Sequence, residues 1–525
     1  MDFINFYQRS ILFFLYEIFI LLIIFLFLNI KSITSKFREI KRKTWIYLLI
    51  IFLAGFFLRV FIFPHFHIMY VDEPWYLEVA KNMNQKLKPV ICQYTDYDLE
   101  TCRHVLKPPA LPFLISIVFL IFGPSNYVAL YFSSLLGSLS IILIFLLTHL
   151  LFKNQNISLW SSFFLALTPL YILWSNSVET NNASVFFVLL TMMFFIIYTK
   201  SREKSIFILT SLSLIFTILI RFENVLLVII FFLAYLKLSK LPTNKFYSFL
   251  NSLFPSIVII ILIIIIIIEP FFLSFILPSL PKYFIDYHHL NFFLLLKEVS
   301  FNYIYLLLIT LGLFFRDKKD TNTITYLIIS FLFFFFFYLP IFSQSRMALT
   351  PGIFMIILSA YSLEKLLSLF KKHYSIARVV IILLLLFIFG LSLNSAYEQT
   401  NFRYNKKILE VESIVQIKEE IPENCYVISE LPTVLSSVSN LRVIGTDTAL
   451  NNPQVIENII KKENCMYYFY DGYCTEFPIS PNQDSIKKCH IMLQTFDNSK
   501  EQTFQRKIKW KKSEYFLFRI NGLRN

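Results

Sequence analysis

The chain has 525 residues, of which 57% are hydrophobic, 18% aromatic and only 16% charged. Soluble globular proteins carry about 25% charged residues, so this composition excludes a soluble domain. Several uncharged runs reach roughly 18 residues or more, the length that a membrane-spanning helix requires. The sequence therefore predicts a polytopic α-helical membrane protein.

The formal net charge of +14 could indicate a nucleic-acid-binding protein, but the basic residues lie in short clusters between apolar runs. Basic clusters of this kind mark the cytoplasmic loops of membrane proteins. We therefore interpret the charge as a determinant of topology and expect no nucleic-acid partner. The five clusters are Lys31/Lys36/Arg38/Lys41/Arg42/Lys43, Lys200/Arg202/Lys204, Lys237/Lys240/Lys245, Arg316/Lys318/Lys319 and Lys371/Lys372/Arg378.

About twelve membrane-spanning helices fit between these clusters. The first apolar run has no basic segment beyond Arg9 and no evident cleavage site, so we interpret it as a retained helix whose amino terminus lies outside. Residues 1–43 then form an extra helix and a basic cytoplasmic loop. The predicted helices lie near 10–30, 44–63, 126–151, 157–174, 183–199, 205–221, 223–239, 249–268, 301–315, 323–341, 347–369 and 377–395.

The segment 64–125 is predicted to be a long external loop. Its apolar run "PPALPFLISIVFLIFG", 108–123, has only about 13 consecutive apolar residues, fewer than the roughly 20 needed to cross a membrane. A crossing here would also invert every later loop. We therefore expect this run to form a helix lying in the outer leaflet.

The six cysteines test this topology independently, because disulfides persist only on the oxidising side of a membrane. All six fall in segments that charge alone places outside. Cys92 and Cys102 are expected to bridge the first external loop. The other four could form two bridges whose pairing the sequence leaves open, namely among Cys425, Cys465, Cys474 and Cys489.

The composition changes after Asn394. Short β-rich runs such as "CYVISE", "LRVIGT" and "CMYYFYD" follow, and "NPQVIENIIKK" between the second and third has a helical pattern after an Asn cap. The sequence therefore predicts a small α/β domain outside the membrane, over residues 396–525.

Ionisable residues beside membrane spans are candidates for function. Those predicted at the outer face combine carboxylates with cations, which suits an acid/base step on a substrate that carries phosphate. They are Asp72, Glu73, Lys107, Glu179, Arg221, Glu223, Glu269 and Arg346.

Asp72 and Glu73 are adjacent in "VDEPWY" and open a predicted helix. At a helix start, one carboxylate can point into a cleft while the other supports it. Burial and a nearby cation can tune such a carboxylate as a general base. The alternative is that Asp72 caps the helix, with Pro74 in its first turn. Both interpretations remain open at this point.

Lys107 and Arg346 suit phosphate recognition, Lys107 as a point charge and Arg346 as a bidentate donor. The alternatives are a lysine that reaches the lipid headgroups and an arginine that anchors a helix end. Arg221 is expected to pair with Glu223, and Glu179 either caps a helix or is a second acid. Tyr76 and His104 are candidate supporting residues around this group.

The spacings of His65/His67 and His288/His289 do not match a helical metal-ligand pair. With only nine glycines and no glycine-rich phosphate loop, a nucleotide fold is not supported. We therefore expect no tightly bound cofactor and a substrate that comes from the membrane. A divalent metal held by Asp72 and Glu73 remains an open alternative.

The sequence resembles the GT-C glycosyltransferases, in the branch of the protein O-mannosyltransferases and the bacterial aminoarabinose transferase that acts on lipid A. The likeness rests on motifs that follow one another between residue 44 and about 395. They are "VDEPWY", "KPPALPFLISIVFLIFG" with its following helix, "LTPLYILWSNSVETNNASVFFVLL", "IRFENVLL" and "SRMALTPGIFMIILSA".

The resemblance implies that residues 44–395 form a catalytic domain that transfers a sugar, with inversion, from a polyprenyl-phosphate donor. The acceptor would be a protein, lipid or glycan outside the cytoplasmic membrane. It also implies that Asp72, with Glu73, supplies the base and that Lys107 and Arg346 contact the carrier phosphate. Two departures stand out: Met347 replaces the family's usual tyrosine, and its acid before the fifth helix corresponds to Glu179 or to Asn181.

Two other functions were weighed. An oligosaccharyltransferase would use a lipid-pyrophosphate donor and a divalent metal. That family carries a Trp-Trp-Asp-Tyr-Gly motif, which "YFYDGYC" matches only weakly. A transporter or lipid flippase is disfavoured because inverted repeats and broken midplane helices are not evident. A purely structural membrane protein would leave Asp72, Glu73 and Lys107 unexplained.

Overall fold

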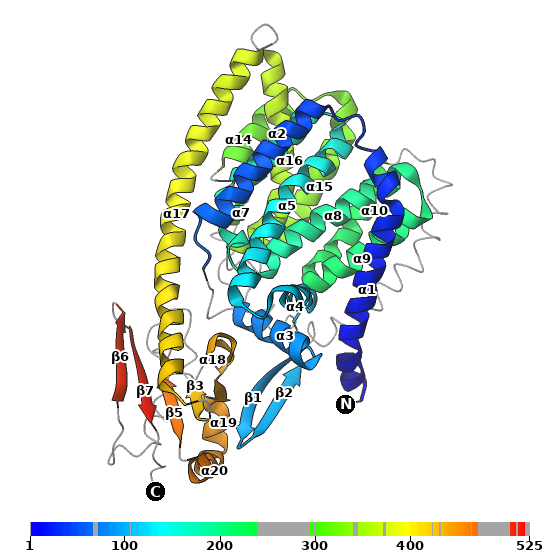
Figure 1. Ribbon diagram of the computed structural model, residues 1–525. Helices are drawn as coiled ribbons and strands as arrows, with labels where there is room; N and C mark the ends of the chain where they lie inside the picture. The colour runs from blue at the N-terminus through cyan, green and yellow to red at the C-terminus, as the bar shows by residue number, and fades with distance from the viewer. Residues whose placement is uncertain are drawn as a thin grey trace.

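The computed structural model shows a helical bundle joined to a small carboxy-terminal sheet (Figure 1). It describes residues 2–66, 72–104, 107–238, 294–298, 301, 303–339, 345–370, 374–422, 424–429, 432–439, 441–463, 465–470, 504–510 and 513–519. The predicted helix 249–268 lies outside these residues, as do Glu269, His67 and the pair His288/His289.

The bundle begins with two apolar helices, α1 (Asp2–Ser35) and α2 (Arg42–Phe57), and α2 continues as a π-helical turn, η1 (Leu58–Ile62). They correspond to the predicted helices 10–30 and 44–63. The chain then forms α3 (Glu73–Lys86), a hairpin of β1 (Val90–Asp96) and β2 (Leu99–His104), and α4 (Ala110–Phe122). With 13 residues, α4 is as short as the sequence indicated, and it packs against α3 and α5.

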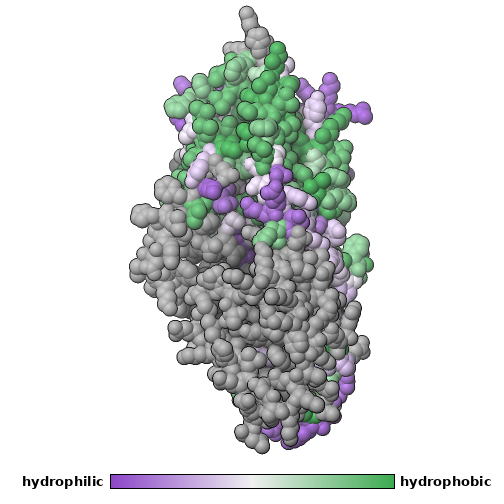
Figure 2. All heavy atoms as spheres, turned by 90° about the vertical axis from the view of Figure 1, so that its left-hand side faces the viewer, coloured by the Kyte–Doolittle hydropathy of each residue, from purple (hydrophilic) through white to green (hydrophobic). Residues whose placement is uncertain are grey.

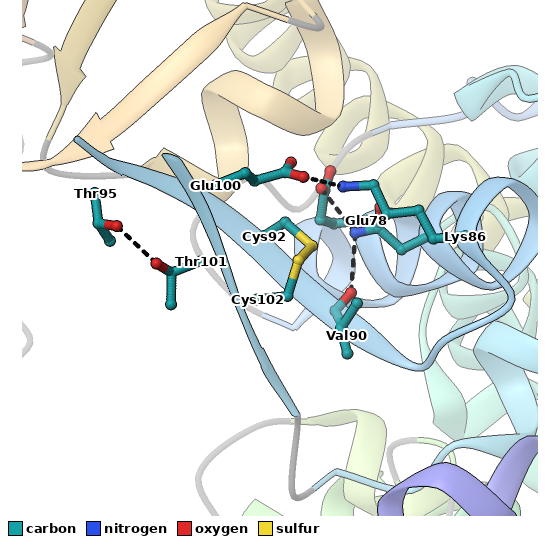
Figure 3. The surroundings of a disulfide bond; sticks show 9 residues. Glu78, Lys86, Val90, Cys92, Thr95, Glu100, Thr101 and Cys102 are labelled. Atoms are coloured by element: carbon teal, nitrogen blue, oxygen red, sulfur yellow. Dashed lines mark hydrogen bonds and ion pairs between the residues drawn. A yellow bond between two sulfur atoms is a disulfide. The ribbon is translucent and has the colours of Figure 1, made fainter. Parts of the chain in front are cut away.

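The hairpin is antiparallel and places Cys92 opposite Cys102, which are joined by a disulfide, the pair expected from the sequence. Figure 3 shows this bond together with the ion pair between Lys86 of α3 and Glu100 of β2, whose atoms lie 2.6 Å apart. The hairpin is therefore fastened both across its strands and to α3.

The middle of the bundle contains α5 (Asn126–Phe152), α6 (Gln155–Leu167), α7 (Pro169–Ser175), α8 (Thr180–Ser201), α9 (Lys204–Ile220), η2 (Phe222–Leu226) and α10 (Leu227–Leu238). The predicted continuous helix 157–174 is wrong. The chain bends by 57° between α6 and α7, because Pro169 has no N–H group to donate to the carbonyl of Leu165.

The bundle is completed by α14 (Ile304–Leu313), α15 (Thr321–Tyr338), α16 (Leu349–Leu369) and α17 (Tyr374–Glu420). Seven described helices are long and apolar enough to cross a membrane, or eight if the bent pair α6–α7 is one span. The protein is thus a multi-pass membrane protein, and the count of about twelve spans remains a prediction.

The outer surface agrees with a bundle embedded in lipid. Figure 2 shows hydrophobic side chains gathered over the upper helices on the face that carries α17, with hydrophilic side chains below them. On α17, Leu383, Phe387 and Leu391 are each more than 60% exposed. Apolar surface of this extent is stable only against lipid or another apolar partner.

Among the described residues, the basic turns between α1 and α2, between α8 and α9 and between α14 and α15 lie at the upper end of the bundle in Figure 1, and α3, α4 and the hairpin lie at the lower end. Ser32 at the end of α1 donates to Glu203 after α8 at 2.9 Å. Lys200 at the end of α8 donates to the carbonyl of Leu150 in α5. The turns assigned to one side by charge are therefore neighbours in space.

The carboxy-terminal sheet has the strand order β4-β3-β5-β7-β6, with β3 parallel to β4 and β5 and the other pairs antiparallel. Cys425 and Cys465 form a disulfide, whereas Cys474 and Cys489 lie outside the described residues. Its elements are β3 (Tyr426–Ser429), α18 (Pro432–Ser439), β4 (Arg442–Gly445), α19 (Thr446–Asn451), α20 (Pro453–Glu463), β5 (Met466–Tyr470), β6 (Phe504–Trp510) and β7 (Ser513–Arg519).

The sheet is fastened to the hairpin and to α3. α17 continues without a break past the predicted boundary at 396 and ends beside β3 (Figure 1). α18 packs against α3, and Arg442 of β4 donates to Asp98 at the hairpin tip at 3.1 Å. The carboxy-terminal sheet therefore covers the outer side of the helix that begins at Glu73.

Arg59 stabilises the bend between α6 and α7, although its side chain is fully buried in an apolar bundle. Its guanidinium donates to the carbonyls of Gly55, Leu165 and Ala166, each at 3.0 Å. The last two belong to the final turn of α6, where helical carbonyls lack intrahelical partners. The buried guanidinium thus supplies hydrogen-bond donors to backbone carbonyls that the bend leaves without helical partners.

Arg59→Met is expected to lower the free energy of unfolding by about 2–4 kcal/mol, because three buried carbonyls lose their donors. Thermal unfolding of the purified protein in detergent measures this loss. Arg59→Lys keeps the charge but has fewer hydrogen-bond donors, so its melting temperature should lie between those of the wild type and Arg59→Met. A methionine variant as stable as the wild type would contradict this role of Arg59.

Candidate active site

The candidate site lies at the amino end of α3, where Asp72 is the N-cap residue. The backbone carbonyl of Asp72 accepts from the amides of Trp75 and Tyr76, both at 3.1 Å, but its side chain makes no capping hydrogen bond. The alternative that the Asp72 carboxylate caps the helix is therefore wrong. The carboxylate is left available for other partners.

Two cations meet at this carboxylate. Lys107 donates to Oδ1 of Asp72, and Arg346 donates through Nη2 to Oδ2 at 3.3 Å. Lys107 precedes α4, and Arg346 lies in the 3₁₀ turn η6 (Ser345–Ala348) that leads into α16. The structure thus brings together three residues that are separated by 35 and 274 positions along the chain.

Aromatic side chains flank both cations. The Lys107 ammonium lies 4.3 Å from the ring centre of Trp75 and 5.9 Å from that of Tyr76. The Arg346 guanidinium lies 5.9 Å from the ring centre of Trp174. Such contacts attract a cation to the face of the ring, so each cation has a second partner besides Asp72.

Glu179 completes this group from the loop before α8. Its Oε1 lies 2.6 Å from Nη1 of Arg346, and its side chain is only 1% exposed. Glu179 occupies the N-cap position of α8 but makes no capping hydrogen bond. Of the two roles that the sequence offered, capping is therefore wrong, and the carboxyl group of Glu179 lies against the guanidinium of Arg346.

The helix α7 places Arg346 opposite Asp72. Tyr171 of α7 donates to the carbonyl of Leu349 at 2.6 Å, and Trp174 donates to Ser345 at 3.3 Å. Both acceptors flank Arg346. The bend that Arg59 stabilises therefore sets the direction of the helix that holds this turn.

Glu73 has a different environment from Asp72. Its side chain is buried, and Oε2 accepts a hydrogen bond from the backbone amide of Val178 at 3.3 Å. This contact ties the start of α3 to the loop that contains Glu179. Although Asp72 and Glu73 are adjacent in the sequence, their carboxylates therefore face different partners.

Arg221 forms the ion pair with Glu223 that the sequence suggested, at 2.7 Å, and also donates to Asn181. Tyr76 is buried beside Lys107. The side chain of His104 lies outside the described part of the molecule. Arg221 therefore belongs to a neighbouring ion pair, whereas Tyr76 adjoins the group through Lys107 and through the backbone carbonyl of Asp72.

The charges set the ionisation of the two carboxyl groups in opposite directions. Burial opposes ionisation of Asp72, but Lys107, then Arg346 and Arg221, outweigh it and lower the pKa of Asp72. Burial raises the pKa of Glu179 to about 8, with Arg346 opposing and Asp72 and Glu73 adding to the rise. Asp72 is thus the anion of the pair at neutral pH.

The raised pKa of Glu179 predicts a loss of stability with rising pH. The folded protein holds this proton more tightly, so the free energy of unfolding falls between pH 4.5 and about 8. Glu179→Gln removes the titration, and its melting temperature is expected to decline less than that of the wild type over this range. Thermal unfolding across the range measures the difference, and parallel declines would contradict it.

The described residues offer no convincing metal centre at this position. Among the described residues, the one group of potential ligands within metal-binding distance of one another is Cys92, Glu100 and Cys102 of the hairpin, and its cysteines are joined in a disulfide. The two acids considered for a divalent metal, Asp72 and Glu73, point to different partners.

Sequence reasoning missed Arg59, Trp75 and Trp174. An arginine inside an otherwise uncharged predicted span was a usable signal for Arg59, because such charges are retained only with partners. The two tryptophans carried no such signal. Their importance depends on which cations lie over their rings.

Comparison with known proteins gives one family match and several structures of the same fold. Residues 106–268 match the family described as dolichyl-phosphate-mannose-protein mannosyltransferase, and this segment contains Lys107, Glu179 and Arg221. No curated protein sequence is detectably similar to the chain.

Solved structures of two proteins share the fold. The archaeal oligosaccharyltransferase AglB from Archaeoglobus fulgidus, in complex with an inhibitory peptide and a dolichol-phosphate, is 14% identical with a TM-score of 0.53, over 82% of this chain and 69% of that chain. ArnT from Cupriavidus metallidurans in the apo state is 13% identical with a TM-score of 0.54, over 90% of this chain and 97% of that chain. ArnT bound to undecaprenyl phosphate matches with 13% identity and a TM-score of 0.52, over 91% and 98%.

At these identities the structural likeness establishes the fold, and the ordered motifs and the matched family segment agree with it. The chain therefore has the fold of these membrane glycosyltransferases, and its residues 106–268 match the family of dolichyl-phosphate-mannose-protein mannosyltransferases.

Proposed function

We propose that this protein transfers a sugar from a polyprenyl-phosphate donor to a hydroxyl group of a protein, lipid or glycan acceptor. The observation that carries the proposal is the convergence of Lys107 and Arg346 on Asp72 at one end of the membrane bundle. Two cations beside one carboxylate suit a reaction in which a base acts on the acceptor while a phosphate departs. The structures of ArnT bound to undecaprenyl phosphate and of AglB in complex with a dolichol-phosphate support a lipid-phosphate donor.

In this mechanism Asp72 accepts the proton of the acceptor hydroxyl. The oxygen attacks the anomeric carbon, the bond from that carbon to the phosphate oxygen breaks, and the polyprenyl phosphate leaves with the electron pair. Lys107 and Arg346 stabilise the charge on the departing phosphate. A single displacement inverts the anomeric configuration. Glu73 fixes the start of α3 through Val178, and Glu179 holds Arg346.

The site and the carboxy-terminal sheet are proposed to lie outside the cytoplasmic membrane, opposite the basic turns. Two arguments support this orientation: basic turns mark the cytoplasmic side, and the disulfides Cys92–Cys102 and Cys425–Cys465 suit an oxidising compartment. The donor would then reach the site laterally from the outer leaflet.

The orientation predicts the labelling of introduced cysteines. In sealed right-side-out vesicles, a membrane-impermeant maleimide is expected to label Asn452→Cys beside α20 and to spare Lys41→Cys between α1 and α2. Both positions are exposed, so access differs only by side. Detergent should make Lys41→Cys reactive. Labelling of Lys41→Cys in intact vesicles would contradict the orientation.

An oligosaccharyltransferase that uses a lipid-pyrophosphate donor is the second candidate, favoured by the fold shared with AglB. The two are separated by incubating the reconstituted protein with radiolabelled polyprenyl-phosphate sugars and with polyprenyl-pyrophosphate sugars, with and without a divalent cation. Transfer from the monophosphate donor supports the main proposal. Transfer from the pyrophosphate donor alone would replace it, and transfer from neither donor would reject both.

A further inference from the structure

Asp72 occupies the point where Lys107 and Arg346 converge, with one oxygen toward each cation. If the proposed function holds, the donor phosphate must be bound by these same two cations. A phosphodiester group presents oxygens that accept hydrogen bonds as a carboxylate does. The Asp72 carboxylate and the donor phosphate therefore require the same donor groups.

The partners of the two cations differ in how easily they can be exchanged. Glu179, the second partner of Arg346, is 1% exposed and lies 2.6 Å from Nη1, which leaves the Nη2 edge to face Asp72. Lys107 has Trp75, at 4.3 Å, as its second partner. The Asp72 side chain is 31% exposed, and its carboxylate is the accessible partner of both cations.

From these contacts we propose that Asp72 fills the donor-phosphate position in the free protein and is displaced by the phosphodiester of the lipid-linked donor. Glu179 and Trp75 keep the cations in place during this exchange. The displaced carboxylate loses its cationic partners to the phosphate and becomes free to accept the proton of the acceptor. The base is thus released only when the donor is bound.

The exchange predicts an unusual effect of removing Asp72. Asp72→Asn is expected to bind a polyprenyl phosphate that carries no sugar about tenfold more tightly than the wild type, because the competing anion is gone. Glu78→Gln is the matched control. Glu78 lies on the same helix, contacts Asn82 and Ser436 instead of the two cations, and should leave the affinity unchanged. Isothermal titration of the detergent-solubilised full chain measures the affinities.

A double-mutant cycle tests whether the competition runs through Lys107. Lys107→Met should weaken binding of the polyprenyl phosphate more in the Asp72→Asn background than in the wild type, because in the wild type Lys107 must first leave Asp72. Asp72→Ser replaces Asp72→Asn if the asparagine variant has a lowered melting temperature.

The outcomes separate the two proposals. An Asp72→Asn variant that binds no more tightly than the wild type, or a cycle with no coupling, overturns the displacement of Asp72. Equal tightening in Glu78→Gln would do the same, because it would indicate a general effect of charge. The proposed function is contradicted by a different result, namely that the wild-type protein transfers no sugar from a polyprenyl-phosphate donor.

Discussion

Asp72→Asn is expected to lower the rate of sugar transfer by about 10²–10⁴-fold, the usual contribution of a general base. Asparagine has almost the same shape as aspartate, and its one side-chain oxygen can still accept a hydrogen bond from one of the two cations, Lys107 or Arg346. It cannot take up the proton of the acceptor hydroxyl. The loss should therefore appear in kcat, measured with a saturating radiolabelled polyprenyl-phosphate sugar in proteoliposomes.

Glu78→Gln is the control for this variant, because it removes a carboxylate from the same helix two turns from Asp72, where the side chain contacts Asn82 and Ser436. Its transfer rate should stay close to that of the wild type. A slow Asp72→Asn with a normal melting temperature supports the base assignment. Equal transfer rates for the wild type and Asp72→Asn would contradict the assignment of Asp72 as the base.

Arg346→Lys is expected to lower kcat by about 10²-fold, although the charge is kept. Arg346 uses Nη1 toward Glu179 and Nη2 toward Asp72, so its planar guanidinium faces two groups at once. A lysine ammonium is a compact point charge and does not reproduce this geometry. The departing phosphate would then lose a fixed donor, and steady-state transfer kinetics measure the change.

Lys86→Met supplies the comparison for Arg346→Lys. Lys86 forms a half-exposed ion pair with Glu100 on the hairpin, away from the cations that face Asp72. Pairs of this kind contribute little to stability, so transfer should be nearly unaffected. If Arg346→Lys were as active as Lys86→Met, Arg346 would have no part in the reaction beyond its charge.

The contrast between Asp72 and Glu73 shows why sequence reasoning left two interpretations open. Both residues begin the same helix, and local rules allow either one to cap it or to face a site. The decision depends on Lys107, Arg346 and Val178, which the fold brings to this point from three other segments. The sequence around Asp72 and Glu73 does not indicate which distant residues the fold brings to them.

The bend at Pro169 shows a different limit. A proline inside an apolar run predicts a kink or a break, but hydropathy alone favoured one continuous span from 157 to 174. The 57° bend became visible only with its stabilising partner, the guanidinium of Arg59, which comes from a different helix. Propensity signals a weak point in a helix, whereas tertiary contacts decide how far the chain turns there.

The sequence by itself determined the elements whose cause is local. Long apolar runs must form helices in lipid because every backbone polar group needs a partner. The predicted helices outside 249–268 overlap described helices, apart from that break and from α17, which continues to Glu420. The sequence also predicted three local features, because each depends on residues close in the chain. They are the short helix at 110–122, the Cys92–Cys102 bridge and the Arg221–Glu223 pair.

Only the tertiary structure decided the chemistry of the site. Asp72, Lys107, Glu179 and Arg346 come from four separate segments, and ion pairs of about 3 Å require atomic positions that no pattern of residue types specifies. Burial then raises the pKa of Glu179 while the two cations lower that of Asp72. The sequence identified the candidate ionisable residues, and the interatomic distances in the structure show which of them pair.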